Sequence, residues 1–161
     1  MKKRINVMCL TVILAAIVAA LGAISVGAFG NNPSVNGQGF LTGSEGGLRT
    51  FSFSAVTKND GTVTGQANLH NRDEGNIYKV QINCLQIVGN RASVSGVIKS
   101  STVPGITGQN AVFVVIDNGE GSGSAPDQIS RLLITDEEVN CRTDIGFRLF
   151  DIEGGNIQVK P

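Results

Sequence analysis

The sequence predicts an all-β domain, an antiparallel barrel of about eight strands, with a β-sandwich as the alternative. Three observations support this fold class. Segments with apolar side chains at every second position recur along residues 48–161, separated by turn-forming Gly, Asn and Asp. No segment in that range keeps a helical apolar period for more than three turns. Small residues occupy the predicted inner faces and suit strong curvature, which favours the barrel: Gly65, Ala67, Ala92 and Gly96.

The N-terminus is predicted to be a signal peptide over residues 1–28 with a helical apolar part. Residues 2–4 are basic, the apolar run 7–24 follows, and small side chains up to Ala28 suit cleavage. The run is also long enough for an uncleaved signal-anchor, which stays open as the alternative. In both cases the positive residues stay inside, so we expect the domain to be secreted or to lie at the extracellular surface, membrane-anchored if uncleaved.

Residues 29–47 are predicted to be a flexible linker. Gly, Asn, Ser and Pro dominate the segment, and Phe40 and Leu41 are its only candidates for packing. The all-β domain is therefore expected over residues 48–161.

The strongest local pattern in this domain predicts a β-hairpin. Phe51 and Phe53 alternate with hydroxyl residues, and the return strand 63–70 alternates apolar with polar positions. Lys58-Asn59-Asp60-Gly61 lies between them and supplies the turn, because Asn, Asp and Gly tolerate positive φ.

The remaining strands follow at similar spacing. After a loop at 71–76, apolar positions alternate from Tyr78 to Cys84 and then shift to Leu85 and Ile87, which predicts a bulge or the end of the strand. The continuous β-branched run 111–116 is typical of a strand buried on both faces. Further strands are expected over 92–96, 128–134, 147–152 and 156–159.

Several motifs are similar to those of a group of secreted prokaryotic β-domains of uncharacterised function, which occur alone or at the ends of large cell-surface proteins. The similarity covers about residues 48–160 and rests on Phe51-Ser52-Phe53, the segment 65–70, Asp117-Asn118-Gly119-Glu120-Gly121, Pro126-Asp127-Gln128-Ile129-Ser130 and Glu153-Gly154-Gly155-Asn156-Ile157-Gln158-Val159. The resemblance implies an extracellular all-β domain, and that group offers no active site to carry over.

Charge excludes a nucleic-acid binder. The chain has 13 basic and 13 acidic residues and no basic run, so an electrostatic footprint for phosphates is missing. Loss of the signal peptide would leave a small acidic excess. We expect the protein to be a monomer, and its partner is not predicted. Contact with a membrane is expected only through an uncleaved N-terminus.

His70 is the only histidine, so any histidine-dependent hydrolysis would need it. A dyad with Asp73 is conceivable, but no serine lies in a nucleophile-elbow motif. One histidine with two paired cysteines does not complete an ordinary zinc site. We interpret His70 as a residue that packs or hydrogen-bonds at the end of a strand.

The acidic residues suggest two further chemistries. Asp117, Glu120 and Asp127 lie in a Gly-rich loop, which raises a calcium hypothesis, although their spacing does not fit an EF-hand. The preferred interpretation is structural, with Asp127 accepting hydrogen bonds from backbone amides. Glu120 and Glu153 form a conceivable carboxylate pair for glycoside hydrolysis, but the chain lacks an aromatic platform. Residues 136–138 are expected to be a solvated loop.

Cys84 and Cys141 are predicted to form a disulfide. They are the only cysteines beyond the signal peptide, and export places them where oxidation is favoured. We expect no catalytic residue, metal or cofactor.

The sequence leaves three functional classes. The leading one is a secreted or surface-exposed, non-enzymatic β-domain without an assigned role. The second is a lipocalin-like barrel that binds a small apolar ligand, and the third is a small carboxylate-based hydrolase. Interior volume separates the first two, because a barrel filled by its core side chains leaves no pocket. The side chains expected to fill it are Phe51, Phe53, Leu69 and Phe113.

Overall fold

The structure is a computed structural model, and it describes residues 32–43, 46–142 and 146–161. The predicted signal peptide, its cleavage site and Cys9 lie outside these residues. Regular structure in the described part is entirely β, in ten strands of one antiparallel sheet. The strands are β1 (Ser34–Thr42), β2 (Leu48–Thr57), β3 (Val63–Asn71), β4 (Asn76–Val88), β5 (Arg91–Ser101), β6 (Asn110–Ile116), β7 (Gln128–Ser130), β8 (Leu133–Thr135), β9 (Leu149–Asp151) and β10 (Gly154–Lys160).

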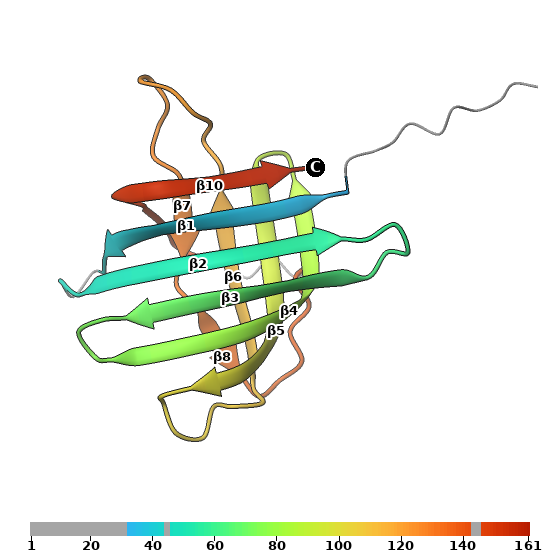
Figure 1. The fold of residues 1–161 in the computed structure, drawn as a ribbon, viewed down its shortest axis with the longest axis vertical. Coiled ribbons are helices and arrows are strands. Elements are labelled where there is room, and N and C mark those ends of the chain that lie inside the picture. The colour runs from blue at the N-terminus through green and yellow to red at the C-terminus, as the bar shows by residue number, and fades with distance from the viewer. Residues whose placement is uncertain (1–31, 44–45, 143–145) are drawn as a thin grey trace, which may run out of the picture. The chain divides into compact units, whose positions relative to one another are not determined.

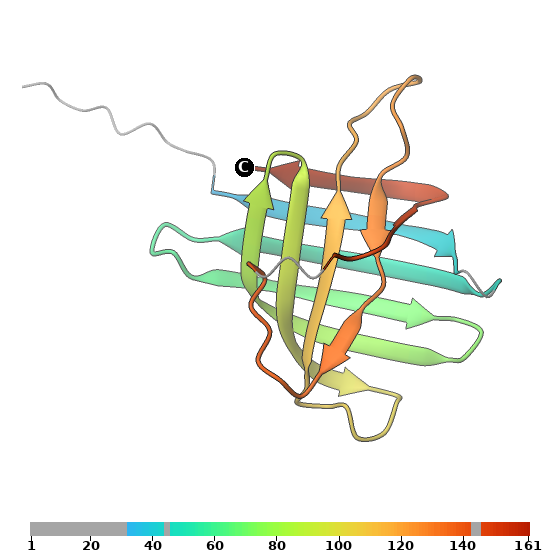
Figure 2. The ribbon, with the colours of Figure 1, turned by 180° about the vertical axis from the view of Figure 1, so that it is seen from behind.

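The sheet of residues 32–161 curls over on itself into a half-barrel. Its strand order is β10-β1-β2-β3-β4-β5-β6-β7-β9, and β8 also pairs with β6. Strands β10, β1, β2 and β3 cross over β5, β6 and β7 at a steep angle, which gives two layers (Figures 1 and 2). The predicted antiparallel, barrel-like all-β fold is thus confirmed, with ten strands instead of about eight.

Strands β4 and β5 form the corner between the two layers. Their pairing shifts register between Lys79 and Val80 and again between Ile82 and Cys84. Such bulges bend a strand and allow it to belong to both layers. The bulge predicted from the shifted apolar positions is therefore confirmed, and β4 continues through it.

The core lies between the layers, where aromatic side chains of β2 and β6 meet. The Phe53 ring stacks on Phe51 at 5.9 Å between centroids and contacts Phe113 edge-to-face at 5.4 Å. Edge-to-face and offset rings satisfy the aromatic quadrupole while they exclude water. The five central residues of β6 are all buried, as predicted for a strand covered on both faces.

The predicted β2–β3 hairpin is also confirmed. Lys58 and Thr62 close the turn through a backbone hydrogen bond of 2.7 Å, and Gly61 has a φ of +81°. The Asp60 carboxylate accepts hydrogen bonds from the hydroxyl and the backbone N–H of Thr62, and the first of these contributes most to lowering the pKa of Asp60.

The predicted linker over residues 29–47 is wrong for residues 34–42, which form β1. This strand pairs with β10 on one side and with β2 on the other. Its inner face carries Gly37 and Gly39 because the rings of Phe53 and Phe51 lie over them. A Cβ added to Gly37 would come within 2.6 Å of the Phe53 ring. Glycine here provides room for a ring, and the folded domain includes β1.

The strand predicted over 128–134 is also corrected, because the structure divides it into β7 and β8. Both pair with β6, but at opposite ends of that strand. Between them the Ser130 hydroxyl accepts a hydrogen bond of 2.9 Å from the backbone N–H of Val114 and donates one of 2.9 Å to the carbonyl of Arg131. The Ser130 side chain thus provides hydrogen-bond partners for backbone groups at the point where β7 ends and its pairing with β6 stops.

Candidate functional site

Two carboxylates of the acidic loop between β6 and β7 accept hydrogen bonds from the edge of β10. Asp127 Oδ2 accepts a hydrogen bond of 2.7 Å from the backbone N–H of Ile157, and Asp117 Oδ2 accepts one of 2.9 Å from that of Val159. The other oxygens of the two carboxylates accept bonds from the N–H groups of Asn118 and Gly119. The preferred structural interpretation of Asp127 is confirmed. Within the described ranges, no cluster of three or more His, Cys, Asp or Glu side chains could hold a metal ion.

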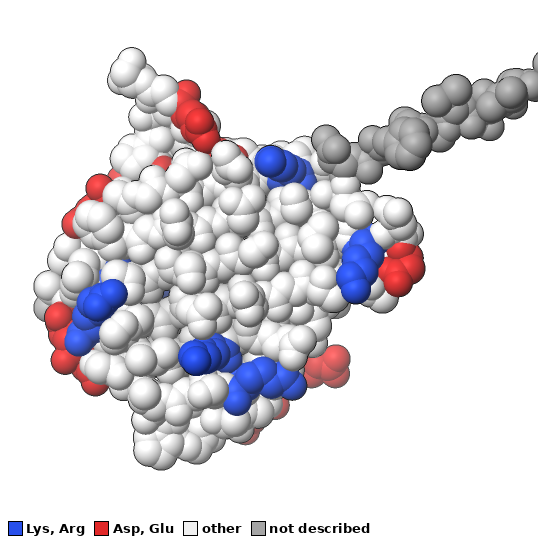
Figure 3. All heavy atoms as spheres, in the orientation of Figure 1, with Lys and Arg blue, Asp and Glu red and all other residues white. Residues whose placement is uncertain are grey.

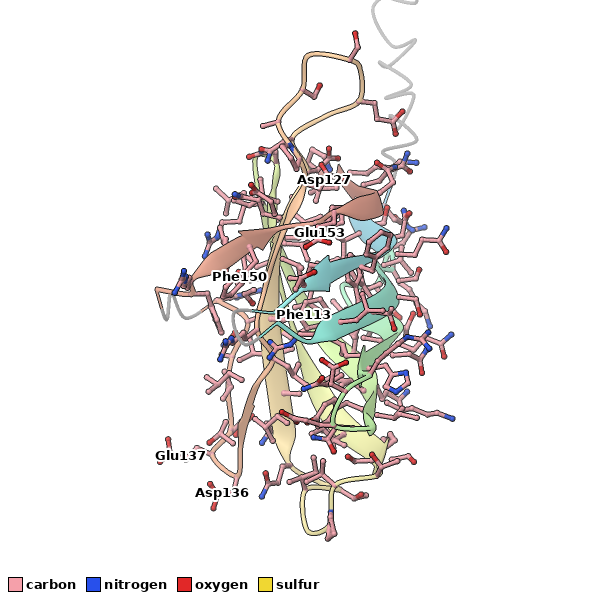
Figure 4. All side chains as sticks on the ribbon, turned by 90° about the vertical axis from the view of Figure 1, so that its left-hand side faces the viewer. Phe113, Asp127, Asp136, Glu137, Phe150 and Glu153 are labelled. Carbon is pink, nitrogen blue, oxygen red and sulfur yellow. A yellow bond between two sulfur atoms is a disulfide. The ribbon has the colours of Figure 1, made fainter. Side chains whose placement is uncertain are left out.

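Glu120, Asp127 and Glu153 line one shallow hollow. Figure 4 shows Asp127 and Glu153 toward the same end of the molecule. Glu120 Oε1 accepts hydrogen bonds of 3.1 Å from the side-chain amides of Asn156 and Gln158. Glu153 Oε1 accepts a bond of 2.8 Å from the backbone N–H of Thr42. Glu120 therefore connects the loop after β6 to β10, and Glu153 connects the turn before β10 to β1, which gives each of them a structural use.

The other polar residues singled out by sequence lie apart from this hollow. His70 is half-buried on β3, in register with Thr50, and makes no hydrogen bond with Asp73 in the part of the chain that the structure describes. Residues 136–138 are exposed, as predicted. Asp136 and Glu137 extend from the end of the fold opposite to Asp127 and Glu153 (Figure 4).

The predicted disulfide between Cys84 and Cys141 is present, with a Cα–Cα distance of 5.8 Å. Cys84 lies at the bulge of β4, and Cys141 is 1% exposed. The bond attaches the segment after β8 to the corner of the sheet. The Ser95 hydroxyl adds a hydrogen bond to the carbonyl of Val139 in the same segment.

The outer face of β10, β1, β2 and β3 is nearly free of charge across its centre (Figure 3). Its side chains are amides and hydroxyls that lie in register across the four strands: Asn156, Gln158, Asn36, Gln38, Ser52, Ser54, Gln66 and Asn68. The depression they line is shallow and open, so it offers a ligand little enclosure.

A deeper pocket of about 300 Å³ opens between the two layers at one end of the half-barrel. Apolar side chains from both layers make up much of its wall: Leu41, Phe51, Leu69, Ile129, Leu132 and Phe150. The guanidinium groups of Arg148 and Arg131 lie 5.1 Å and 5.7 Å from the centre of the Phe150 ring. Cation–π contacts of this kind fix an aromatic wall in place.

One end of the pocket is polar and contains Arg49 and Tyr78. Arg49 shares the inner face of β2 with Phe51, and its Nε atom is buried without a hydrogen-bond partner. Burial first, and then the charge of Glu74, raises the pKa of Tyr78 above its ordinary value of 10.0, while Arg49 acts in the opposite direction. The pocket thus combines an apolar wall with the charged side chains of Arg49, Arg131 and Glu74, with His70, and with the phenol of Tyr78, which is protonated at neutral pH.

Sequence reasoning did not identify Arg49. The alternation of β2 points to it, because alternate residues of a strand share one face. The inner face of β2 carries Arg49, Phe51, Phe53 and Ala55. A charged residue on the inner face of a strand is unusual and calls for a partner.

No family model, curated protein or solved structure matches this chain. None of the described residues belongs to a helix with the length and hydropathy needed to cross a bilayer.

Proposed function

We propose that this chain is a non-enzymatic binding domain that acts outside the cytoplasm and holds a small, largely apolar molecule in the pocket of its half-barrel. The observation that carries the proposal is the pocket of about 300 Å³ between the layers, with apolar walls from both. Ligand sites are typically concave and mostly apolar, with a few polar groups at defined places. Displacement of water from such a pocket by an apolar ligand lowers the free energy of the system.

The packing of the interior favours binding over a purely structural barrel. Phe53 and Phe113 fill the middle of the fold, where they contact each other. Phe51 and Leu69 pack on this core as expected, and they also line the pocket on one side. The interior is therefore packed at its centre and hollow at one end, which supports the second functional class predicted from the sequence.

Two further observations support the rest of the proposal. The carboxylates considered for hydrolysis accept hydrogen bonds that attach a loop and a turn to neighbouring strands, so a non-enzymatic role accounts for them. A disulfide between Cys84 and Cys141 is stable in an oxidising compartment. The predicted signal peptide and the resemblance to secreted β-domains agree with that compartment.

Two neighbouring leucines provide a matched test. Leu132 lines the pocket, whereas Leu133 is 38% exposed. Calorimetry measures the binding of 1-octanol. We expect the wild-type chain and the Leu133→Trp variant to bind it with equal affinity. Leu132→Trp places an indole in the pocket and should weaken binding at least about tenfold, or about 1.4 kcal/mol. Equal binding by both variants, or none by the wild type, would contradict the proposal.

A further inference from the structure

We infer that the pocket binds its ligand as an anion, with a carboxylate end group held by Arg49 and an alkyl body against the apolar wall. This inference rests on the proposed function and specifies the ligand class of the same pocket.

The position of Arg49 carries the argument. It lies on the inner face of β2, in register with Leu41 of β1 and Asn71 of β3. Its guanidinium packs closely over Gly43, where an added Cβ would come within 2.8 Å of Nε. The absence of a side chain at Gly43 therefore allows the guanidinium to lie against the backbone at the mouth of the pocket.

Among the described residues, the half-buried side chain of Arg49 has one donor without a partner. Its Nε is buried and makes no hydrogen bond, and the described residues provide no carboxylate paired with its guanidinium. Glu74, the acidic residue that lines the pocket, is exposed and accepts a hydrogen bond of 2.6 Å from the side-chain amide of Asn76. A buried donor that no protein group satisfies is rare and calls for an explanation, and a negative charge in the pocket beside the same guanidinium would offset the cost of burying it.

A carboxylate completes this site better than a neutral group. The guanidinium presents parallel N–H donors that match the two oxygens of a carboxylate, and the low dielectric of the pocket strengthens the pair. Tyr78 lines the same end, and its phenol is a hydrogen-bond donor at neutral pH. The anion thus gains two kinds of donor from β2 and β4.

The volume limits the size of the ligand. A pocket of about 300 Å³ holds about ten waters, since each water occupies about 30 Å³ of the liquid. Octanoate, with about ten non-hydrogen atoms, has a comparable size and serves as the probe.

The experiment compares octanoate with 1-octanol by calorimetry on the full chain at neutral pH. We expect the wild-type chain to bind octanoate at least about tenfold more tightly than 1-octanol. Arg49→Met should remove this preference, so that octanoate binds no more tightly than 1-octanol. Arg72→Met is the matched control, because Arg72 is exposed beyond the end of β3, and it should keep the preference.

The outcomes separate the two proposals. If neither probe binds the wild-type chain, the proposed function and this inference both fail. If 1-octanol binds and octanoate binds no better, or if Arg49→Met keeps the preference, only the carboxylate assignment is overturned. The wild-type comparison needs no variant, so misfolding of Arg49→Met would not leave the question open. As a second readout, octanoate but not 1-octanol should raise the pKa of Tyr78, the single tyrosine, because it brings a negative charge nearby.

Discussion

The side chain of Asp127 accepts a hydrogen bond of 2.7 Å from the backbone N–H of Ile157, 30 residues further along the chain. Asp127 is 7% exposed and Ile157 is 1% exposed, so the bond is shielded from water. With the bond between Asp117 and Val159, it attaches the loop after β6 to the last strand. The two carboxylates thus occupy backbone N–H groups of β10 to which a further strand would otherwise hydrogen-bond.

Replacing Asp127 by Asn should destabilise the domain by about 1–3 kcal/mol. Each carboxylate oxygen of Asp127 accepts a bond from one backbone N–H, and the NH2 group of Asn would face one of these two donors without being able to accept a hydrogen bond from it. Urea unfolding measures this change. Asp136→Asn, in an exposed loop, is the control and should change the free energy of unfolding by less than about 0.5 kcal/mol. Similar losses in the two variants would show that the buried bond has no special weight.

Gly37→Ala should destabilise the domain by about 1–3 kcal/mol, because the new methyl group overlaps the Phe53 ring and forces the packed core to shift. Gly123→Ala is the matched control, since an added Cβ there meets no atom within 4 Å. Thermal unfolding of both variants would test the prediction. A melting temperature for Gly37→Ala equal to that of Gly123→Ala would contradict the close packing of β1 on β2.

Removing the disulfide with Cys84→Ser and Cys141→Ser together should lower the free energy of unfolding by about 4 kcal/mol, because the bond closes a long loop in the unfolded chain. Thiol labelling of the denatured, unreduced chain should modify no cysteine other than Cys9. Reduction before labelling should expose Cys84 and Cys141 as well. Labelling of either residue without reduction would contradict the bond.

Tyr78 should make stability fall at high pH. Its pKa is raised in the folded state by burial first and by Glu74 second, so the folded state holds the phenol proton more tightly than the unfolded state. The resulting stabilisation is complete below the unfolded pKa of about 10 and is lost as the pH rises through the folded pKa. The difference between wild type and Tyr78→Phe isolates this effect in urea unfolding at several pH values. A constant difference across that range would refute it.

Local alternation was sufficient to predict much of the fold. The β2–β3 hairpin, the buried β6 and the bulge after Ile82 all follow from where apolar side chains recur. The disulfide was predictable because only two cysteines lie beyond the predicted signal peptide, which leaves one pairing. These features depend on short segments or on counting, which a sequence displays directly.

Other features depend on contacts between distant segments. Strand β1 was mistaken for a linker because Gly37 and Gly39 carry no apolar side chain, and their partners Phe53 and Phe51 lie on another strand. The sequence left an interior pocket open as an alternative but could not predict its lining, since its walls come from strands at both ends of the chain. Inward parity identifies Arg49 in retrospect, but the missing partner of its Nε is visible only in three dimensions.

The bonds from Asp117 and Asp127 to β10 also affect how copies of the chain meet. An edge strand with free N–H groups is a template on which a second molecule adds by strand pairing, the first step toward fibres. Here carboxylates occupy the N–H groups of Ile157 and Val159, and their loop lies alongside that edge. The strand at the other end of the order, β9, has three residues and gives an incoming strand little to pair with. We therefore expect the carboxylates of Asp117 and Asp127 also to protect the chain against aggregation through the edge of β10.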